Sequence, residues 1–402
     1  MTSTARLEQD LTIWLSETAM PRTPDYADEI LDEVAHIRQR PRWTFLRRWL
    51  PVPEIAWNAP VGRRTALGGV LLLVLALLLA AVAIFVGSRR PPMPPPFGLA
   101  ANGLLVSSHD GDIVLVDPDT LTARTIVAGI YSDEHPRWSL DGTRLAFLRQ
   151  TGSGQAIVIA DDSGRILAIT DEFASPDSDS VRWSPDSRQI AVVANGAPGR
   201  AIYLVDVATG LTRKLKSRYV DGEIFWRPPD GGQLLAKAGN YGERLGLVST
   251  ADGGIADVPT GSFDGHVLRA LGMTPDGRRA LFQDDMAERP QTIVVDVETG
   301  ADIHLDVAYG HLSNDGTRVA GIDVTDDSGG RLCIVPITGG SCNPIDQPVA
   351  VEGAHGAALS WSPDDRWLAL LGDTVWLVDP DGIVPPREVA ADGPGSWQRL
   401  AP

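Results

Sequence analysis

The feature that most constrains the fold is a short phrase that recurs along most of the chain. "WSPDDRW" begins at Trp361, "WSPDSR" begins at Trp183, and "WSLDGTR" begins at Trp138. Its aspartate also occurs in altered copies of the phrase, and consecutive copies stand 39 to 49 residues apart. A unit of this length that recurs six times predicts a repeat fold built from small, similar sheets. The six aspartates are Asp141, Asp186, Asp230, Asp276, Asp315 and Asp364.

The phrase has the composition of a tight turn between two strands. Tryptophan ends one strand, and proline in the turn fixes φ. Aspartate bonds to nearby backbone amides, and the glycine after it permits a positive φ where the chain reverses. Because a short apolar segment follows each turn, every copy predicts a strand–turn–strand corner.

A second repeated phrase lies between the corners. It consists of an apolar strand, a turn rich in Asp, Thr and Gly, and another strand, which together predict a hairpin. Seven hairpins that alternate with corners predict four-stranded blades arranged in a ring, the β-propeller architecture. The hairpins are residues 113–126, 157–170, 202–215, 245–259, 293–305, 332–345 and 375–389.

The last residues explain why seven hairpins come with only six corners. "GSWQRLAP" places Trp397 where a blade supplies the strand that precedes the corner. Pairing this strand with residues 103–127 would complete the first blade and remove two exposed sheet edges. We therefore predict an all-β, seven-bladed propeller over residues 99–402, with six blades as the alternative.

These motifs resemble the TolB-like propeller family, whose blades carry W-S-P-D-G, an apolar strand and an I-Y-x-x-D strand. The resemblance begins near residue 100 and implies an extracytoplasmic adaptor that binds other proteins or peptides. "FWRPPDGG" around Asp230 and "MTPDG" around Asp276 depart from the family pattern, so we expect distorted turns there. The matching positions are Trp138, Asp141, Gly142, Trp183, Pro185, Asp186, Asp276, Gly277, Asp315, Gly316, Trp361, Pro363 and Asp364.

An uncharged apolar run at residues 66–87 predicts a membrane crossing. Its 22 residues would rise roughly 33 Å as a helix, enough for a hydrocarbon core of about 30 Å. A cleaved signal peptide is the alternative, but the run is too long for one and a long segment precedes it. We predict one transmembrane helix within residues 63–90, followed by a stiff proline-rich spacer at residues 91–98.

The distribution of arginine predicts the orientation of this helix. Seven arginines lie between residues 38 and 64, whereas only Arg89 and Arg90 follow the helix before Arg124. Because positive charge stays in the cytoplasm, we predict a single-pass protein of the cell membrane with a cytoplasmic N-terminus and an extracytoplasmic propeller.

The predicted cytoplasmic segment, residues 1–62, has a helical pattern. Apolar residues at helical spacing predict helices within 5–18 and 25–39, and the Trp/Arg-rich stretch 41–51 suits the lipid headgroup layer. The segment resembles the cytoplasmic part of membrane-anchored anti-sigma factors in layout only. His36 stands alone there and no cysteine precedes Cys333, so no zinc site is predicted. A cytoplasmic partner for residues 1–60 is an open alternative.

Charge excludes one class of partner. The chain carries a formal net charge of −17 at pH 7, and after residue 90 it has 43 acidic and 24 basic residues. Such an acidic domain repels phosphate backbones, so we expect no nucleic acid partner.

The residues that could carry chemistry form few patterns. Cys333 and Cys342 lie on the two arms of the sixth hairpin, which predicts a disulfide that serves as a structural staple. Nucleophile elbows, phosphate loops and zinc-protease motifs are absent, and the Asp pairs lack calcium-loop spacing. We therefore predict no metal, no cofactor and no catalytic residue. The motif tryptophans are interpreted as packing anchors, with a ligand cage as the alternative.

Four histidines lie shortly before corners and are weak candidates for a shared site on one loop face. They are not at equivalent positions, and solvated loop residues are the alternative. The four are His135, His266, His311 and His355.

The leading hypothesis is a non-catalytic, membrane-anchored propeller that acts as an adaptor or sensor and binds a protein or peptide through loops at one end of the ring. The second is an anti-sigma-type regulator whose N-terminal segment binds a transcription factor. The third is an extracytoplasmic enzyme that uses the channel of the propeller.

Overall fold

The computed structural model divides the chain into two units, Met1–Arg89 and Arg90–Pro402, which are considered separately. Within them the structure describes residues 69–79, 93–196, 199–216, 220–238, 244–259, 268–323, 330–345, 358–371, 374–389 and 395–401.

The described part of the first unit is one helix, residues 69–79, with exposed side chains. No helix among the described residues combines the length and the apolar character that a membrane crossing needs. Residues 66–68 and 80–87 of the predicted crossing lie outside the described residues. So do the helices and the Trp/Arg-rich stretch predicted for residues 1–62.

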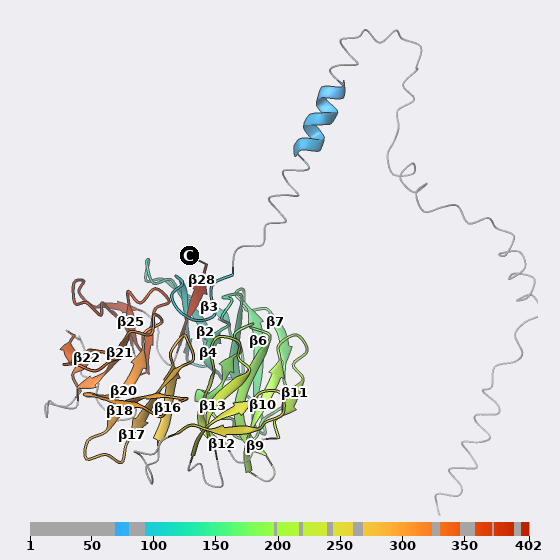
Figure 1. The fold of residues 1–402 in the computed structure, drawn as a ribbon. Helices are drawn as coiled ribbons and strands as arrows, with labels where there is room; N and C mark the ends of the chain where they lie inside the picture. Colours follow the sequence, from blue (N-terminus) through green and yellow to red (C-terminus); the bar gives the residue numbers. More distant parts are fainter. Residues whose placement is uncertain are drawn as a thin grey trace, which may run out of the picture. The chain divides into compact units, whose positions relative to one another are not determined.

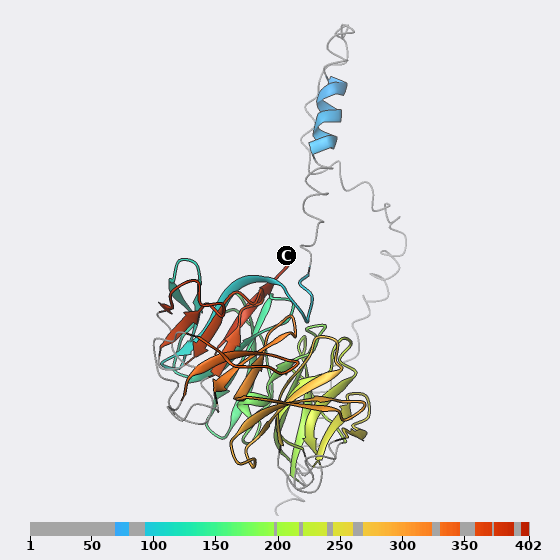
Figure 2. The same cartoon turned by 60° about the vertical axis from the view of Figure 1, so that its left-hand side comes forward.

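The described residues of the second unit form seven four-stranded antiparallel sheets (Figures 1 and 2). The prediction of seven blades is confirmed, and the six-bladed alternative is wrong. The strands of blades 1 to 3 are β1 Ala101–His109, β2 Asp112–Val116, β3 Ala123–Val127, β4 Asp133–Trp138, β5 Arg144–Gln150, β6 Gln155–Asp161, β7 Ile166–Ile169, β8 Arg182–Trp183, β9 Gln189–Gly196, β10 Gly199–Asp206 and β11 Thr212–Lys214.

A short 3₁₀ helix, η2 (Ser178–Ser180), precedes β8. The strands of blades 4 to 7, with the C-terminal strand, are β12 Val220–Trp226, β13 Gln233–Ala238, β14 Arg244–Ser249, β15 Ile255–Asp257, β16 Leu268–Met273, β17 Arg279–Asp284, β18 Gln291–Asp296, β19 Asp302–Leu305, β20 Val307–Leu312, β21 Arg318–Asp323, β22 Leu332–Pro336, β23 Asn343–Pro344, β24 Ala358–Trp361, β25 Leu368–Leu371, β26 Val375–Val378, β27 Arg387–Val389 and β28 Ser396–Leu400.

The C-terminal strand completes the first blade. Blades 2 to 7 each use four consecutive strands, whereas blade 1 has the order β28-β1-β2-β3. β28, which is labelled beside β2 and β3 in Figure 1, pairs antiparallel with β1. Trp397 lies opposite Leu105. Both ends of the chain segment that forms the ring therefore belong to one sheet, and β1 is paired along both edges.

The hydrophobic core is divided among the boundaries between blades. The buried apolar residues of the described part form seven clusters, each with side chains from two adjacent blades. The cluster between blades 7 and 1 includes Leu105 and Val116 from one side and Ala369 and Leu377 from the other. Because no blade has a core of its own, stability depends on closing the whole ring.

A repeated hydrogen-bond circuit builds the corners. At the corner of blade 2, the Asp141 carboxylate accepts from the Ser139 hydroxyl at 2.6 Å and from the Thr143 N–H at 3.0 Å. The Ser139 hydroxyl in turn accepts from the N–H of Arg144 at 2.9 Å. The same circuit recurs around Asp186, Asp276, Asp315 and Asp364.

The two corners expected to be distorted differ from each other. Around Asp276, Thr274 replaces serine and its hydroxyl keeps the circuit, so that expectation was wrong. Around Asp230, Arg227 stands at the hydroxyl position, the Pro228–Pro229 peptide is cis, and Asp230 accepts only from the Gly232 N–H among the described bonds. Only this corner loses the hydroxyl.

The position after the motif aspartate connects neighbouring corners. At Gly142, φ is +70° and an added Cβ would lie 2.1 Å from the Arg399 carbonyl oxygen, so only glycine fits. Ser187 and Asp365 occupy this position in blades 3 and 7, also at positive φ. Both use their side chains to bind the preceding corner: Ser187 Oγ accepts from the Asp141 N–H, and Asp365 accepts from Asn314 and Asp315.

A disulfide joins Cys333 in β22 to Cys342 just before β23, with 5.6 Å between the Cα atoms.

We expect the Cys333→Ala/Cys342→Ala variant to lose about 2.5 kcal/mol of unfolding free energy, because the bond closes a short loop in the unfolded chain. Chemical denaturation with and without reductant measures this. The double variant is the control, since reductant should leave it unchanged. An unaltered midpoint for the reduced native chain would contradict the prediction.

Candidate functional site: the axial cavity

The first strands of the blades surround the axis of the ring. Contacts across blade boundaries join β8 to β12, β12 to β16, β16 to β20, β20 to β24, β24 to β28 and β28 to β4. Each first strand ends at a corner, so all corners lie at one end of the axis, here called the corner end. Loops that lead from the last strand of one blade to the next blade lie at the opposite end, the entry end.

The motif tryptophans connect the blades. In four of them, the indole Nε1–H donates to the carbonyl oxygen of the residue before the equivalent position in the preceding blade. These bonds are Trp183 to Arg137 at 3.1 Å, Trp226 to Arg182 at 3.0 Å, Trp361 to His311 at 2.8 Å and Trp397 to Ser360 at 3.2 Å. Trp138 Nε1 has no partner among the described residues. These four tryptophans therefore act as links between blades.

In blades 2 and 3 the residue before the tryptophan is an arginine that reaches toward the following blade. Arg182 Nη2 lies 3.4 Å from a Glu223 carboxylate oxygen, and its guanidinium stacks on the Phe225 ring at 4.8 Å. Arg269 Nη1 lies 3.8 Å from the other oxygen of Glu223. Burial raises the pKa of Glu223, while the two arginines act in the opposite direction.

Arg137 is the less compensated cation. Its Nη2 lies 3.7 Å from Asp179, a side chain that is 60% exposed, and its Nε is buried without a partner among the described residues. Burial, together with the neighbouring Arg182, lowers the pKa of Arg137 to about 9. We define Arg137, Arg182, Arg269, Glu223 and Asp179 as the axial cluster, in which three cations face two anions.

The candidate histidines are not together on one loop face. His135 lies within β4 and His311 within β20, so both are strand residues. The loop interpretation was wrong for these two, because each strand starts before its histidine. Burial and nearby Arg269 lower the pKa of His311 to about 4. His266 and His355 lie outside the described residues, among which no group of three metal-ligating side chains occurs.

A cavity of about 250 Å³ lies beside the axial cluster, between the first strands of blades 1 to 5. Its walls are aromatic or apolar except at Arg137, Arg182 and Ser396. We call it the axial cavity. It is lined by Phe97, Arg137, Trp138, Leu140, Arg182, Trp183, Phe225, Trp226, Pro228, Met273, Ser396 and Trp397.

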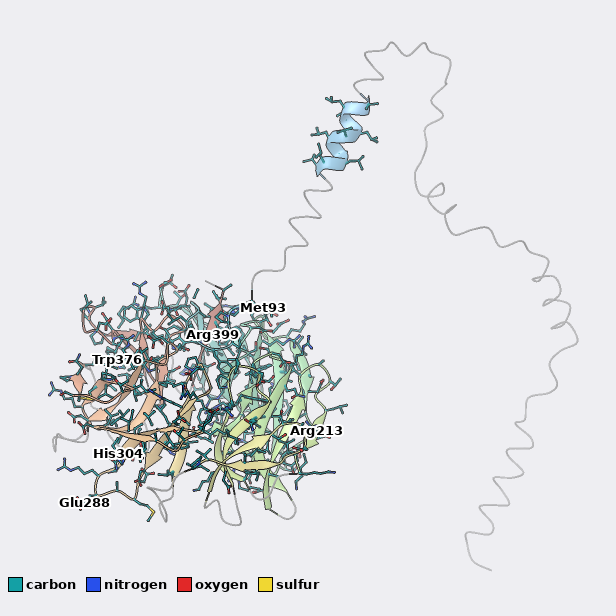
Figure 3. The ribbon with its side chains drawn as sticks, in the orientation of Figure 1. Met93, Arg213, Glu288, His304, Trp376 and Arg399 are labelled. Atoms are coloured by element: carbon teal, nitrogen blue, oxygen red, sulfur yellow. A yellow bond between two sulfur atoms is a disulfide. The ribbon has the colours of Figure 1, made fainter. Side chains whose placement is uncertain are left out.

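Part of the wall comes from outside the blades. Residues 93–98 of the predicted spacer contact the propeller at the corner end, and Phe97 lines the cavity. Arg399 donates to the carbonyl oxygens of Pro95 and Gly98, and its Nη1 donates to Asn314 Oδ1 at 2.8 Å. Figure 3 labels Met93 and Arg399 where this segment meets the propeller. The spacer is therefore attached to the ring over its described residues.

Two arginines of the axial cluster are marked by their place in the sequence. Arg137 and Arg182 directly precede motif tryptophans, and side chains of successive strand residues point in opposite directions. If the tryptophan packs toward one blade, the residue before it faces the other side. Glu223 and Arg269 carry no such signal, because bulges shift the register of β12 and β16.

These features define a class of protein: a seven-bladed β-propeller with four-stranded blades, closed by its C-terminal strand around an axis that carries arginines. No protein-family model matches the sequence. Over 104 residues the chain is 32% identical to the Tol-Pal system protein TolB of Chromobacterium violaceum. The match covers 25% of this chain and 23% of TolB, and it confirms the TolB-like character of the repeats over that stretch.

Solved structures share the fold at low sequence identity. Oligogalacturonate lyase from Vibrio parahaemolyticus is 12% identical with a TM-score of 0.52, and the match covers 74% of this chain and 89% of the lyase. The periplasmic gluconolactonase of Pseudomonas aeruginosa is 16% identical with a TM-score of 0.51, over 74% of this chain and 99% of the lactonase. These similarities establish the fold and leave the activity of this chain open.

Proposed function

We propose that this protein is a membrane-anchored, non-catalytic propeller that binds a protein or peptide partner outside the cytoplasm. The observation that carries the proposal is the axial cavity, whose aromatic walls and arginines offer apolar contact and charge-assisted hydrogen bonds together. Similarity to the Tol-Pal system protein TolB supports a partner of this kind. The apolar run at residues 66–87 supports anchoring.

Contact between the spacer and the ring supports a sensor role. The spacer lies between the predicted membrane helix and blade 1, and Arg399 bonds its backbone to the corner end. A partner that shifts the first strands would also shift the segment that leads to the anchor. Residues 93–98 therefore offer a covalent route from the binding site to the membrane.

Site-specific photocross-linking in cells tests the proposal. Ile130 is 94% exposed in the loop between β3 and β4 at the entry end, and Ile383 is 81% exposed in a hairpin at the corner end. We expect a photoreactive residue at position 383, at the corner end where Phe97 and the motif tryptophans line the axial cavity, to give one discrete protein adduct, and the matched position 130 to give none. The adduct should remain in membranes after alkaline extraction. Identical patterns at both positions, or none, would count against the proposal.

Enzymatic activity is the alternative, because structures of a lyase and a lactonase share this fold. Purified full-length protein should leave aldonolactones and oligogalacturonates unchanged. Turnover of either substrate that disappears in the Arg182→Gln variant would overturn the non-catalytic assignment.

A further inference from the structure

The axial cavity has the chemistry of a site for one particular end group. Aromatic rings from five different places in the sequence form its walls, which suits a flat apolar group. Its volume of about 250 Å³ is close to the lower limit of small-molecule sites, on the order of 300 Å³. The cavity can therefore hold one ring-sized group with a short polar attachment, and not a folded domain.

The polar side of the cavity has an unbalanced positive charge. Arg182 and Arg269 share the single carboxylate of Glu223, and the ion pair that Arg137 forms among the described residues is with the exposed Asp179. The neutral Ser396 is the other polar group of the wall. A cation that lacks hydrogen-bond acceptors raises the free energy of the protein where little water reaches it. A carboxylate that accepts hydrogen bonds from the guanidinium lowers this free energy.

The pKa values agree with this arrangement. Burial lowers the pKa of Arg137 and of His311, and nearby arginines lower both further. His311 is therefore neutral at pH 7 and adds no charge of its own. An anion bound between Arg137 and Arg182 would raise the lowered pKa of Arg137 again.

The chain itself shows that the walls accept an aromatic ring. Phe97 contributes its side chain to the cavity from a bend, residues 96–98, that belongs to no blade. Arg399 holds that bend through the carbonyl oxygens of Pro95 and Gly98. A peptide segment with an aromatic side chain is thus a compatible neighbour for these walls.

We propose that the axial cavity binds the carboxylate-bearing aromatic end of a ligand, such as the C-terminal residue of a peptide, with the ring between the tryptophans and the carboxylate at Arg137 and Arg182. The inference rests on the proposed function, since it names the chemical class of the bound group. It requires no covalent step.

Calorimetric titration of the purified full-length chain with N-acetyl-L-phenylalanine tests the inference. The matched probe is the corresponding carboxamide, which has the same ring but no charge. We expect the acid to bind at least tenfold more tightly than the amide, and N-acetylglycine to give no heat of binding. Equal binding of acid and amide would overturn the proposal, as would a lack of binding by both.

Variants locate the binding. Arg182→Gln and Arg137→Gln should each abolish the preference for the acid, and Arg182→Lys should keep part of it. Arg213→Gln is the control, because Arg213 lies in the outer strand β11 away from the cavity (Figure 3). Thermal melting of each variant verifies folding. An acid preference that survives both glutamine variants would overturn the proposal.

The two proposals fail separately. If the probes do not bind but the cross-link from position 383 forms, the partner binds elsewhere and only the inference about the cavity is wrong. If the acid binds selectively but no protein is cross-linked, the ligand is a small molecule and the protein-binding function is wrong.

Discussion

Replacing Trp397 by alanine is expected to lower the free energy of unfolding by about 3–5 kcal/mol. The side chain is buried in the cluster that joins blade 7 to blade 1, and its Nε1 donates to the Ser360 carbonyl oxygen at 3.2 Å. It also lies on β28, the strand that completes blade 1. The substitution therefore leaves a cavity and an unsatisfied carbonyl at the boundary where the ring closes. Denaturant unfolding monitored by near-UV circular dichroism measures the loss.

Leu400→Ala is the matched control, because Leu400 is on the same strand but 40% exposed. It should change stability by about 0.5 kcal/mol or less. Deletion of residues 396–402 should be more severe than either substitution, since it removes the inner strand of blade 1 and exposes the edge of β1. If Trp397→Ala and Leu400→Ala had the same small effect, the C-terminal strand would not be closing the ring.

Replacing Asp365 by alanine is expected to lower the free energy of unfolding by about 3 kcal/mol, which is the second large effect. The carboxylate is 4% exposed and accepts from the N–H groups of Asn314 and Asp315 and from Asn314 Nδ2, at 2.8 to 2.9 Å. Alanine leaves these three donors without their acceptor and keeps a side chain at a positive φ of 58°. Asp365→Gly should cost less than alanine, because it relieves the backbone conformation.

Ser187 provides the comparison within the same chain. It occupies the equivalent corner position at a φ of 56°, but its hydroxyl accepts only the Asp141 N–H. Ser187→Gly should therefore cost about 1 kcal/mol, clearly less than Asp365→Gly. Thermal and denaturant unfolding of the three variants gives the order. A larger loss for Ser187→Gly than for Asp365→Gly would mean that the corners are not held together by these bonds.

Much of the architecture could be predicted because its causes are local. Corner aspartates bond to amides two residues away, and glycine at the next position follows from a positive φ, so each corner leaves a signature in a few adjacent residues. The spacing of these signatures gives the length of a blade. Trp397 without a corner of its own was enough to predict that the last strand completes the first blade.

The predicted membrane crossing and the cytoplasmic segment remain predictions, since the described residues include only part of them. The axial cluster could not be predicted in the way that the corners were, because its residues come from different blades. Arg137, Glu223 and Arg269 are far apart in the sequence, and only the ring brings them near the axis. The spacer is similar: its prolines predicted an extended segment, but its contact with Arg399 depends on a residue about 300 positions away.

The sequence by itself determined the repeat unit, the number of blades and the strand that closes the ring, because turn chemistry and strand alternation act over a few residues. Only the tertiary structure decided which side chains face the axis, where the positive charge is left unbalanced and which segment lines the cavity. Those properties depend on distances between blades, which are set by the packing of seven apolar boundaries around a common axis.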